Sequence, residues 1–286
     1  MKRVAIRHPS ALRPLALVLG TNEIASAIAM KLTEACFAVV MSHDPFPPVI
    51  RRGMAFYDCL FGEPCNVEGV VGERADTIVE IVRTHADPRK VAVTRMHLTE
   101  VIASRSPSIL VEGRMQKRRT TPDLRGIAAI TIGVGPQFEV GVNCDVGIET
   151  HPAEIGALIS LGATKLADGR ARTLGGAGRE RFVYSDRDGV WHTPVDIGTR
   201  VFKGLQLGLL GKMPIFAPMD GTLRGIVRDG LHVPAGVKLL EIDPRGREAC
   251  WTGMDERGRA IARSVVAAAQ RGMLADQEVE RVSVHA

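Results

Sequence analysis

A continuous apolar run, Leu15-Ala16-Leu17-Val18-Leu19, is followed at once by the turn Gly20-Thr21-Asn22-Glu23. Unbroken apolar runs of this length are typical of strands that lie buried on both faces of a parallel sheet. After the turn, apolar residues recur at helical spacing from Ile24 to Leu32, and a second apolar run covers 37–41. This order predicts a β-α-β unit, the building block of a parallel sheet.

The same alternation continues along the chain. It predicts helices at 77–85, 97–104 and 154–161, strands at 90–94, 108–112, 127–133 and 146–149, and a Gly-rich linker at 169–178. Strands that alternate with helices favour the α/β class, so we expect a Rossmann-like, doubly wound parallel sheet.

An internal repeat marks the last part of the chain. A shift of 32 residues places Asp188-Gly189 on Asp220-Gly221 and Gly198 on Gly230. Each half reads as a short half-sheet with glycines at its turns, and neither half could bury its apolar face alone. The two half-sheets should therefore pack into one small all-β sandwich.

This spacing resembles the barrel-sandwich hybrid of biotinyl and lipoyl carrier domains. Carriers present a modified lysine in the hairpin between the halves, but here the connection is the short Gly211-Lys212-Met213-Pro214. We therefore expect no biotin or lipoate on Lys212. The chain divides into a Rossmann-like α/β domain at 1–120, a second α/β segment with the Gly-rich linker at 121–180, and a duplicated β-sandwich module with a C-terminal helix at 181–286.

Composition and charge exclude several classes of protein. The 286 residues are 45% hydrophobic and 24% charged, which excludes wholesale disorder and a membrane channel. The net charge is only +5, and basic residues cluster only at 116–119, so no nucleic-acid partner is expected. The five cysteines form no CxxC pair, which fits a reducing compartment. With no apolar run of 18 residues and no pattern of a signal peptide, we expect a cytoplasmic protein without a membrane partner.

The turn after the first strand is one candidate anion site. Gly20, Asn22 and Ala25 stand where a dinucleotide-binding fingerprint has its three small residues, although Asn22 replaces the second glycine. Asp44 follows the second strand, where an acid would accept hydrogen bonds from ribose hydroxyls. Two interpretations stay open: a dinucleotide site, or a strand-to-helix turn without a ligand.

A second candidate site follows the strand predicted at 127–133. The backbone amides around Gly133 and Gly135 could hold an anion, and Asn143, Asp145 and Glu149 are near in sequence. The alternative is a sharp bend, with Asp145 capping a turn and Glu149 in solvent.

The pair Arg51-Arg52 is a third candidate, because guanidinium groups bind phosphate or carboxylate through two hydrogen bonds, although paired arginines also lie on surfaces. The candidate ligand-binding residues are Gly20, Asn22, Asp44, Arg51, Arg52, Gly133, Gly135, Asn143, Asp145 and Glu149. The sequence contains no HExxH, GxSxG or Walker motif, so nothing predicts a protease, an esterase or a kinase. Catalysis stays open, and a non-catalytic role is favoured.

Several segments, taken together, resemble one family. They are Val49-Ile50-Arg51-Arg52, Gly133-Val134-Gly135-Pro136, Ile148-Glu149-Thr150, Leu223-Arg224-Gly225 and Asp243-Pro244-Arg245-Gly246. In this order, over about 15–270, the chain resembles the YqeB-like proteins of the selenium-dependent molybdenum hydroxylase system, accessory proteins grouped with xanthine and carbon monoxide dehydrogenase maturation factors.

The resemblance implies a maturation factor for a molybdenum hydroxylase-type enzyme. Such a factor would bind a nucleotide- or pterin-like anionic ligand, which could be a nucleotide or the molybdenum cofactor itself. It would also dock a client enzyme. The chain departs from the family pattern at Asn22, Gln137 and Asn143, all in candidate ligand loops. The alternatives are an NAD(P)-dependent oxidoreductase with Asp44 on the ribose and a structural assembly protein without a ligand, and homo-oligomerisation is open.

Overall fold

A large mixed sheet organises the first half of the chain in the computed structural model, which describes residues 12–116, 122–169 and 171–284. Its strands are β1 (Leu15–Leu19), β2 (Ala38–Ser42), β3 (Cys65–Val67), β4 (Val70–Arg74), β5 (Lys90–Thr94), β6 (Ile109–Glu112), β7 (Ile130–Val134), β8 (Val146–Ile148) and β9 (Leu158–Ile159). The order is β3-β4-β5-β2-β1-β6-β7-β8-β9. The cluster predicted at 117–119 and the boundary predicted at 120 lie outside the described residues.

The strands from β4 to β8 pair in parallel, and β3 and β9 add antiparallel edges. The predicted α/β class is confirmed, with a mixed rather than an all-parallel sheet. The β3–β4 hairpin was not predicted from the sequence, and its turn at Glu68-Gly69 has positive φ at both residues.

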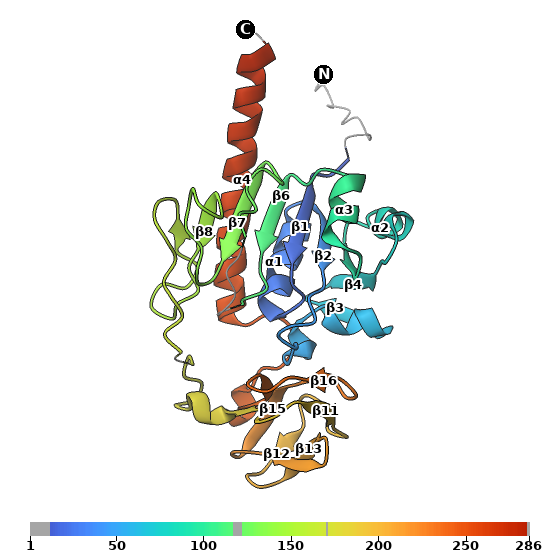
Figure 1. Ribbon diagram of the computed structural model, residues 1–286, viewed down its shortest axis with the longest axis vertical. Coiled ribbons are helices and arrows are strands. Elements are labelled where there is room, and N and C mark those ends of the chain that lie inside the picture. Colours follow the sequence, from blue (N-terminus) through green and yellow to red (C-terminus); the bar gives the residue numbers. More distant parts are fainter. Residues whose placement is uncertain (1–11, 117–121, 170, 285–286) are drawn as a thin grey trace, which may run out of the picture.

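Helices cover both faces of this sheet (Figure 1). On one face lie α1 (Glu23–Glu34) and the long α4 (Glu256–Val284), which pack on each other. On the other face lie α2 (Ile78–Thr84) and α3 (Leu98–Ser104). The apolar run of β1 serves both faces, because Ala16 and Val18 join the core with α1, while Leu17 joins the core with α2 and α3. The strand is therefore buried on both sides, as its sequence predicts.

The helix predicted at 154–161 is wrong. The segment forms a turn and then the short strand β9, which pairs antiparallel with β8. Gly156 has φ of +80°, a value that ends a right-handed helix, and an added Cβ there would lie 3.0 Å from the Ala260 carbonyl oxygen. The hydroxyl of Ser264 donates to the Gly156 carbonyl at 2.6 Å. Close packing on α4 therefore overrides the local helical spacing.

The C-terminal module consists of two antiparallel sheets around one apolar core. Its strands are β10 (Phe182–Tyr184), β11 (Gly189–His192), β12 (Arg200–Val201), β13 (Gln206–Leu210), β14 (Met213–Phe216), β15 (Gly221–Ile226), β16 (His232–Val233) and β17 (Lys238–Asp243). The sheets have the orders β10-β17-β15-β12 and β14-β13-β11-β16. Short 3₁₀ helices at Arg52–Met54, Tyr57–Phe61, Arg179–Arg181 and Gly246–Glu248 complete the elements.

The 32-residue repeat is visible in the strands. Adding 32 to the residue numbers of β10, β11, β12 and β13 gives residues in β14, β15, β16 and β17, respectively. The same shift therefore relates the strands of one sheet to the strands of the other. The prediction of one half-sheet from each half is wrong, because each sheet takes two strands from each half. This interleaving lets equivalent side chains share one core, as with Trp191 and Leu223, both fully buried. Lys212 lies exposed in the turn between β13 and β14, and the expected absence of biotin and lipoate stays a prediction.

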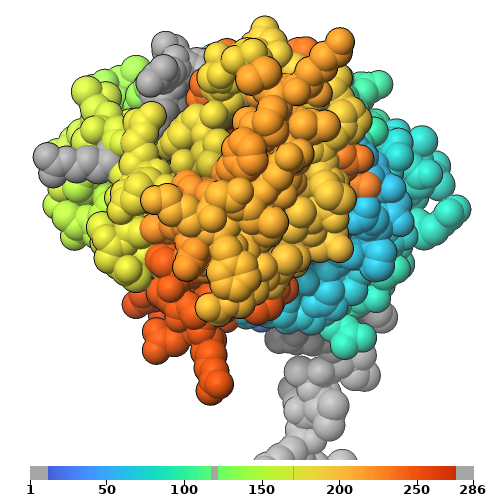
Figure 2. Space-filling view, turned by 90° about the horizontal axis from the view of Figure 1, so that it is seen from below, coloured from blue at the N-terminus to red at the C-terminus, as the bar shows by residue number. Residues whose placement is uncertain are grey.

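The module is inserted between β9 and α4, so the chain enters it and leaves it near the same end of the sheet (Figure 1). Figure 2 shows the module, in yellow and orange, lying across the α/β part. Beyond the module, α4 returns to pack on α1, β7 and β8. Among the described residues, no helix is both long enough and apolar enough to cross a membrane.

Candidate functional site

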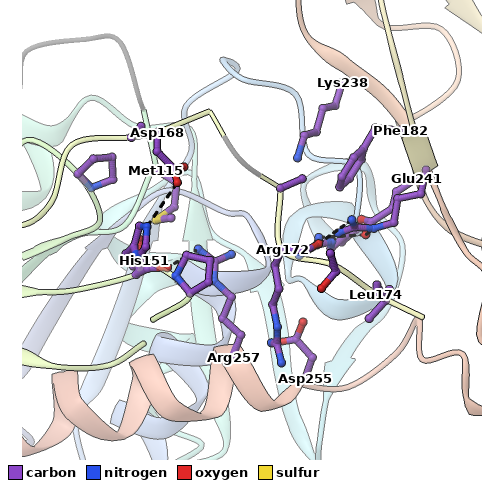
Figure 3. A pocket seen from close by; sticks show the side chains of 18 of the residues that line it. Met115, His151, Asp168, Arg172, Leu174, Phe182, Lys238, Glu241, Asp255 and Arg257 are labelled. Carbon is purple, nitrogen blue, oxygen red and sulfur yellow. Dashed lines mark hydrogen bonds and ion pairs between the residues drawn. The ribbon is translucent and has the colours of Figure 1, made fainter. Parts of the chain in front are cut away.

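A cavity of about 210 Å³, called the pocket below, lies between the large sheet and the module. Its walls come from the segments after β6, β7 and β8, the linker into the module, strands β10, β15 and β17, and the start of α4. Ligands of open α/β sheets bind beside the carboxyl ends of the strands, which is the edge that the pocket occupies. In Figure 3, His151 and Asp168 lie on one side, and Phe182, Lys238 and Glu241 lie on the other.

Charged side chains dominate the wall. Among the described residues the cations are Arg51, Lys165, Arg172, Arg181, Arg224, Lys238, Arg245 and Arg257. The acids are Glu149, Asp168, Glu241, Asp255 and Glu256. Glu23, Asp243 and Glu154 pair with wall cations from behind the wall, so the charges of the whole cluster are close to balance. A ligand would therefore be bound by those charged groups that have no partner within the protein.

Glu241 is the centre of the largest ion cluster. Its carboxylate is fully buried and lies 2.6 Å from Arg51, 3.2 Å from Arg181 and 3.8 Å from Arg224. Burial alone would raise the pKa of Glu241, but the nearby guanidinium groups, Arg51 foremost, lower it. The cluster joins the sheet to the module and forms one wall of the pocket.

Arg224 reaches this cluster from an irregular point in β15. The pairing of β15 with β17 shifts register between Leu223 and Gly225, which leaves Arg224 as the extra residue of a bulge. Its side chain is only 3% exposed and pairs with Asp255 at 2.7 Å. Among the described residues its Nε has no hydrogen-bond acceptor. A buried donor without an acceptor is unfavourable, so this atom would gain from a ligand oxygen or a water molecule.

Arg257 is the pocket's unpaired guanidinium. Its Nη2 donates to the Thr150 carbonyl at 3.5 Å, and within the described ranges it forms no ion pair with a carboxylate. Burial lowers the pKa of Arg257, and the negative charge of Glu23 offsets this only in part. Guanidinium groups bind oxyanions through paired hydrogen bonds, so Arg257 is suited to an anionic ligand group.

The pocket's histidine is held on both ring nitrogens. His151 Nε2 lies 3.4 Å from an Asp168 carboxylate oxygen, and Nδ1 accepts from the Ala153 amide at 3.3 Å. Glu149 is also engaged, because its oxygens accept from the amides of Thr150, His151 and Lys165. Since both ring nitrogens of His151 are engaged, this arrangement favours binding over proton transfer by His151.

Of the ten residues predicted to bind a ligand, Arg51 and Glu149 line the pocket. Arg51 binds a carboxylate through two hydrogen bonds, but that carboxylate belongs to Glu241. Burial would lower the pKa of Arg51, yet Glu241 and Glu23 raise it above the ordinary value. Arg52 does not line the pocket and donates to Asp58 at 2.6 Å and to the Ile226 carbonyl at 3.1 Å. Both arginines fasten the module to the α/β part rather than lying on the surface.

At the turn after β1, which contains Gly20, the Asn22 side chain accepts the hydrogen bonds of the first amides of α1. Asn22 Oδ1 accepts from Ile24 and Ala25, the first free amides of α1, and its Nδ2 donates to the Gly113 carbonyl at 2.8 Å. A pyrophosphate would need these amides. Asp44 stands at the predicted place but accepts hydrogen bonds from Arg114 and Gln116. Dinucleotide binding here stays a prediction that would require displacing Asn22.

The two glycine turns lie on either side of the segment that follows β6. A Cβ added to Gly20 would lie 3.1 Å from Arg114, and one added to Gly135 would lie 3.1 Å from the sulfur of Met115. Gly133 serves a different purpose, because an added Cβ would lie 2.1 Å from the Phe138 ring. Side chains and backbone of 113–115 thus fill the space between the turns, and the pocket lies beyond it.

Asn143 and Asp145 have local partners. Asn143 accepts from the Glu139 amide and donates to the Gln137 carbonyl, which stabilises the loop after β7. Asp145 accepts from the Thr131 amide at 2.7 Å, near the start of β7 and thus at the opposite end of that strand from Gly135. Neither residue lines the pocket.

Sequence reasoning missed Arg224, Glu241 and Arg257. One signal was present: Glu241 and Asp243 interrupt an apolar strand, and acids inside such strands are buried only when they are paired. Arg224 lies in a segment that carries the family resemblance, without an assigned role. Arg257 has no sequence signal, because it resembles any charged residue of a first helical turn.

Comparisons with known proteins give one strong likeness. No family model matches the sequence. The chain is 30% identical over 283 residues to the uncharacterized protein YqeB of Escherichia coli (strain K12), which covers 96% of this chain and 51% of YqeB. The chain thus spans about half the length of that relative.

Solved structures show only faint likeness. An aspartoacylase family protein from Mesorhizobium loti has 11% identity and a TM-score of 0.26, covering 82% of this chain and 87% of that one. The ectoine utilization protein EutE (DoeB) from Ruegeria pomeroyi, with product bound, has 10% identity and a TM-score of 0.26, covering 81% and 85%. These values are too low to bear on function. The chain is therefore similar to YqeB over nearly its whole length.

Proposed function

We propose that this protein is an accessory protein that binds an anionic small molecule in the pocket. One observation carries the proposal: Arg257, in the wall of a partly open cavity at the carboxyl edge of the sheet, has no carboxylate partner among the described residues. The buried Arg224 Nε, without a hydrogen-bond acceptor in the same described set, lies 3.8 Å from Glu241 and leaves the hydrogen bonding behind that wall incomplete. An unpaired guanidinium in a small cavity favours occupation by an oxyanion.

In the fuller form of the proposal, the protein is a cytoplasmic maturation factor for a molybdenum hydroxylase-type enzyme. The pocket would bind a nucleotide- or pterin-like ligand, and the module would dock the client enzyme. The support for this fuller form is the family resemblance that the sequence carries. The engaged ring nitrogens of His151 favour a carrier over a catalyst.

The NAD(P)-dependent oxidoreductase is less favoured. Asn22 holds the α1 amides that a pyrophosphate would use, and Asp44 is paired with Arg114. If the binding test fails, the result would favour a purely structural assembly protein.

The proposal is tested by isothermal titration calorimetry of the full chain with AMP, a small carboxylate and reduced NAD. We expect at least one anion to bind and Arg257→Gln to weaken it by about tenfold or more, because a charged hydrogen-bonded group is lost. The matched control is Arg271→Gln on the exposed side of the same helix, which should bind as the wild type does. If no anion binds, or if both variants weaken binding equally, the binding function is wrong.

The client role is tested separately. In cells that lack the gene, a molybdenum hydroxylase should accumulate with incomplete cofactor, and the wild-type gene should restore its activity. The Arg257→Gln gene should fail to restore it if the ligand serves maturation. Full hydroxylase activity without the gene would remove the maturation role and leave the binding function standing.

A further inference from the structure

The geometry points to a singly charged oxyanion, a carboxylate or a phosphate diester, as the group that the pocket accepts, with polyphosphates and phosphate monoesters disfavoured. This inference rests on the binding function proposed above and narrows its ligand class, since it disfavours those nucleotide- or pterin-like ligands that carry a phosphate monoester.

Most cations of the pocket wall form ion pairs with carboxylates of the protein. Arg51, Arg181 and Arg224 are paired with Glu241 or Asp255. Arg245 pairs with Asp243 at 2.7 Å, Lys165 with Glu154 at 2.6 Å and Arg172 with Glu256 at 3.4 Å. Within the described wall, Arg257 is the guanidinium that has no carboxylate at ion-pair distance. Because the charges of the whole cluster are close to balance, a ligand with one negative charge can pair with Arg257 and adds less uncompensated charge than a ligand with two.

Carboxylates in the pocket wall would repel negative charge on a ligand. Asp168 and Glu149 stand on the His151 side of the pocket, and Asp255 immediately precedes the first turn of α4 that carries Arg257. Burial alone would raise the pKa of Asp255, but a hydrogen bond from the Gly258 amide and the nearby arginines lower it, so it stays charged in its ion pair with Arg224. A second negative charge on the ligand would add to the charges of Asp168 and Glu149 in a partly desolvated space, which is unfavourable.

The volume of the pocket favours a small ligand. A cavity of about 210 Å³ holds a small organic body with one anionic group. Phe182 and Leu174 supply apolar surface for the body of the ligand.

The experiment measures one aromatic scaffold with different charges by calorimetry on the full chain. Benzoate and methyl phenyl phosphate carry one negative charge, and phenyl phosphate carries close to two at neutral pH. We expect one or both monoanions to bind and phenyl phosphate to bind severalfold more weakly. Comparing the two monoanions distinguishes a carboxylate from a diester ligand.

Two variants locate the effect. Arg257→Gln should weaken the bound monoanion by about tenfold or more, because the paired hydrogen bonds are lost. Asp168→Asn should improve phenyl phosphate more than it improves the monoanion, because it removes one facing carboxylate. Asp186→Asn is the control, since Asp186 is exposed and pairs with Arg187 away from the pocket. Thermal unfolding of each variant confirms that the fold is retained.

Tighter binding of phenyl phosphate than of either monoanion to the wild type would overturn the single-charge inference and leave the anion-binding function intact. Unchanged charge selectivity in Asp168→Asn would also count against it. Absence of binding by all three probes would instead contradict the proposed function.

Discussion

Arg51 and Glu241, which lie 190 positions apart in the sequence, form a two-pronged ion pair across the boundary between the large sheet and the module. The Nε–Oε2 distance is 2.6 Å, and the Nη2–Oε1 distance is 3.1 Å. The remaining Nη1 donates to Glu23 at the start of α1, at 2.8 Å. One guanidinium thus ties α1, the segment before Arg52–Met54 and β17 together.

We expect Arg51→Met to reduce the free energy of unfolding by about 3 kcal/mol, because breaking a buried pair leaves a buried carboxylate with fewer partners. Urea denaturation followed by tryptophan fluorescence measures the change. Arg187→Met, whose partner Asp186 is exposed, should change stability little. Equal effects of the two substitutions would show that the pair does not hold the parts together.

The Glu241 carboxylate should give the fold an acid-sensitive component. Its pKa is lowered in the folded protein from an ordinary value of 4.5, so its stabilising contribution is present above that pH and is lost as the pH falls further. The destabilisation caused by Glu241→Gln should therefore be largest near about pH 7 and shrink below about pH 4.5. Denaturation curves of both proteins across this range measure it. A penalty that stays constant with pH would mean that this group has the same pKa folded and unfolded.

Gly133→Ala should destabilise the protein by about 1–3 kcal/mol through overpacking. The added methyl would lie 2.1 Å from the buried ring of Phe138. The second substitution Phe138→Leu in the same chain should recover part of the loss, because it removes the ring. If Gly133→Ala were as stable as the wild type, the glycine would be free for the ligand role that its sequence suggests.

Asn22→Ala should cost about 1–2 kcal/mol, because the cap of α1 and the tie to Gly113 are both lost. The stability of Asn22→Ser should fall between those of the wild type and Asn22→Ala, since a serine hydroxyl can cap the helix but does not reach the Gly113 carbonyl. Thermal unfolding with circular dichroism measures the order. A neutral Asn22→Ala would indicate that the α1 amides need no protein partner.

The sheet was predictable wherever the signal was local. The run at β1 and the spacing in α1 record burial directly, since both faces of a central strand must be apolar. The 32-residue repeat likewise predicted duplicated strands. The prediction at 154–161 failed because Gly156 packs on Ala260 and Ser264, a contact across about a hundred residues that no local pattern records.

The candidate site was less predictable for a related reason. The two glycine turns lie at strand ends as expected, but the segment 113–115 and the Asn22 side chain fill the space around them. Arg51 was singled out as a carboxylate binder, and it binds one from its own chain. The pocket itself is formed by pieces that meet only after the module has docked on the sheet.

The sequence by itself determined the α/β class, the burial of the central strands and the duplication of the module, because these follow from apolar spacing over a few neighbouring residues. Only the tertiary structure decided which half contributes each strand of the module, which charges are paired and that Arg257 is left without a carboxylate in the described wall. The physical reason is that ion pairing and close packing depend on distances between segments far apart in the chain, whereas periodicity reports only on which face of an element is buried.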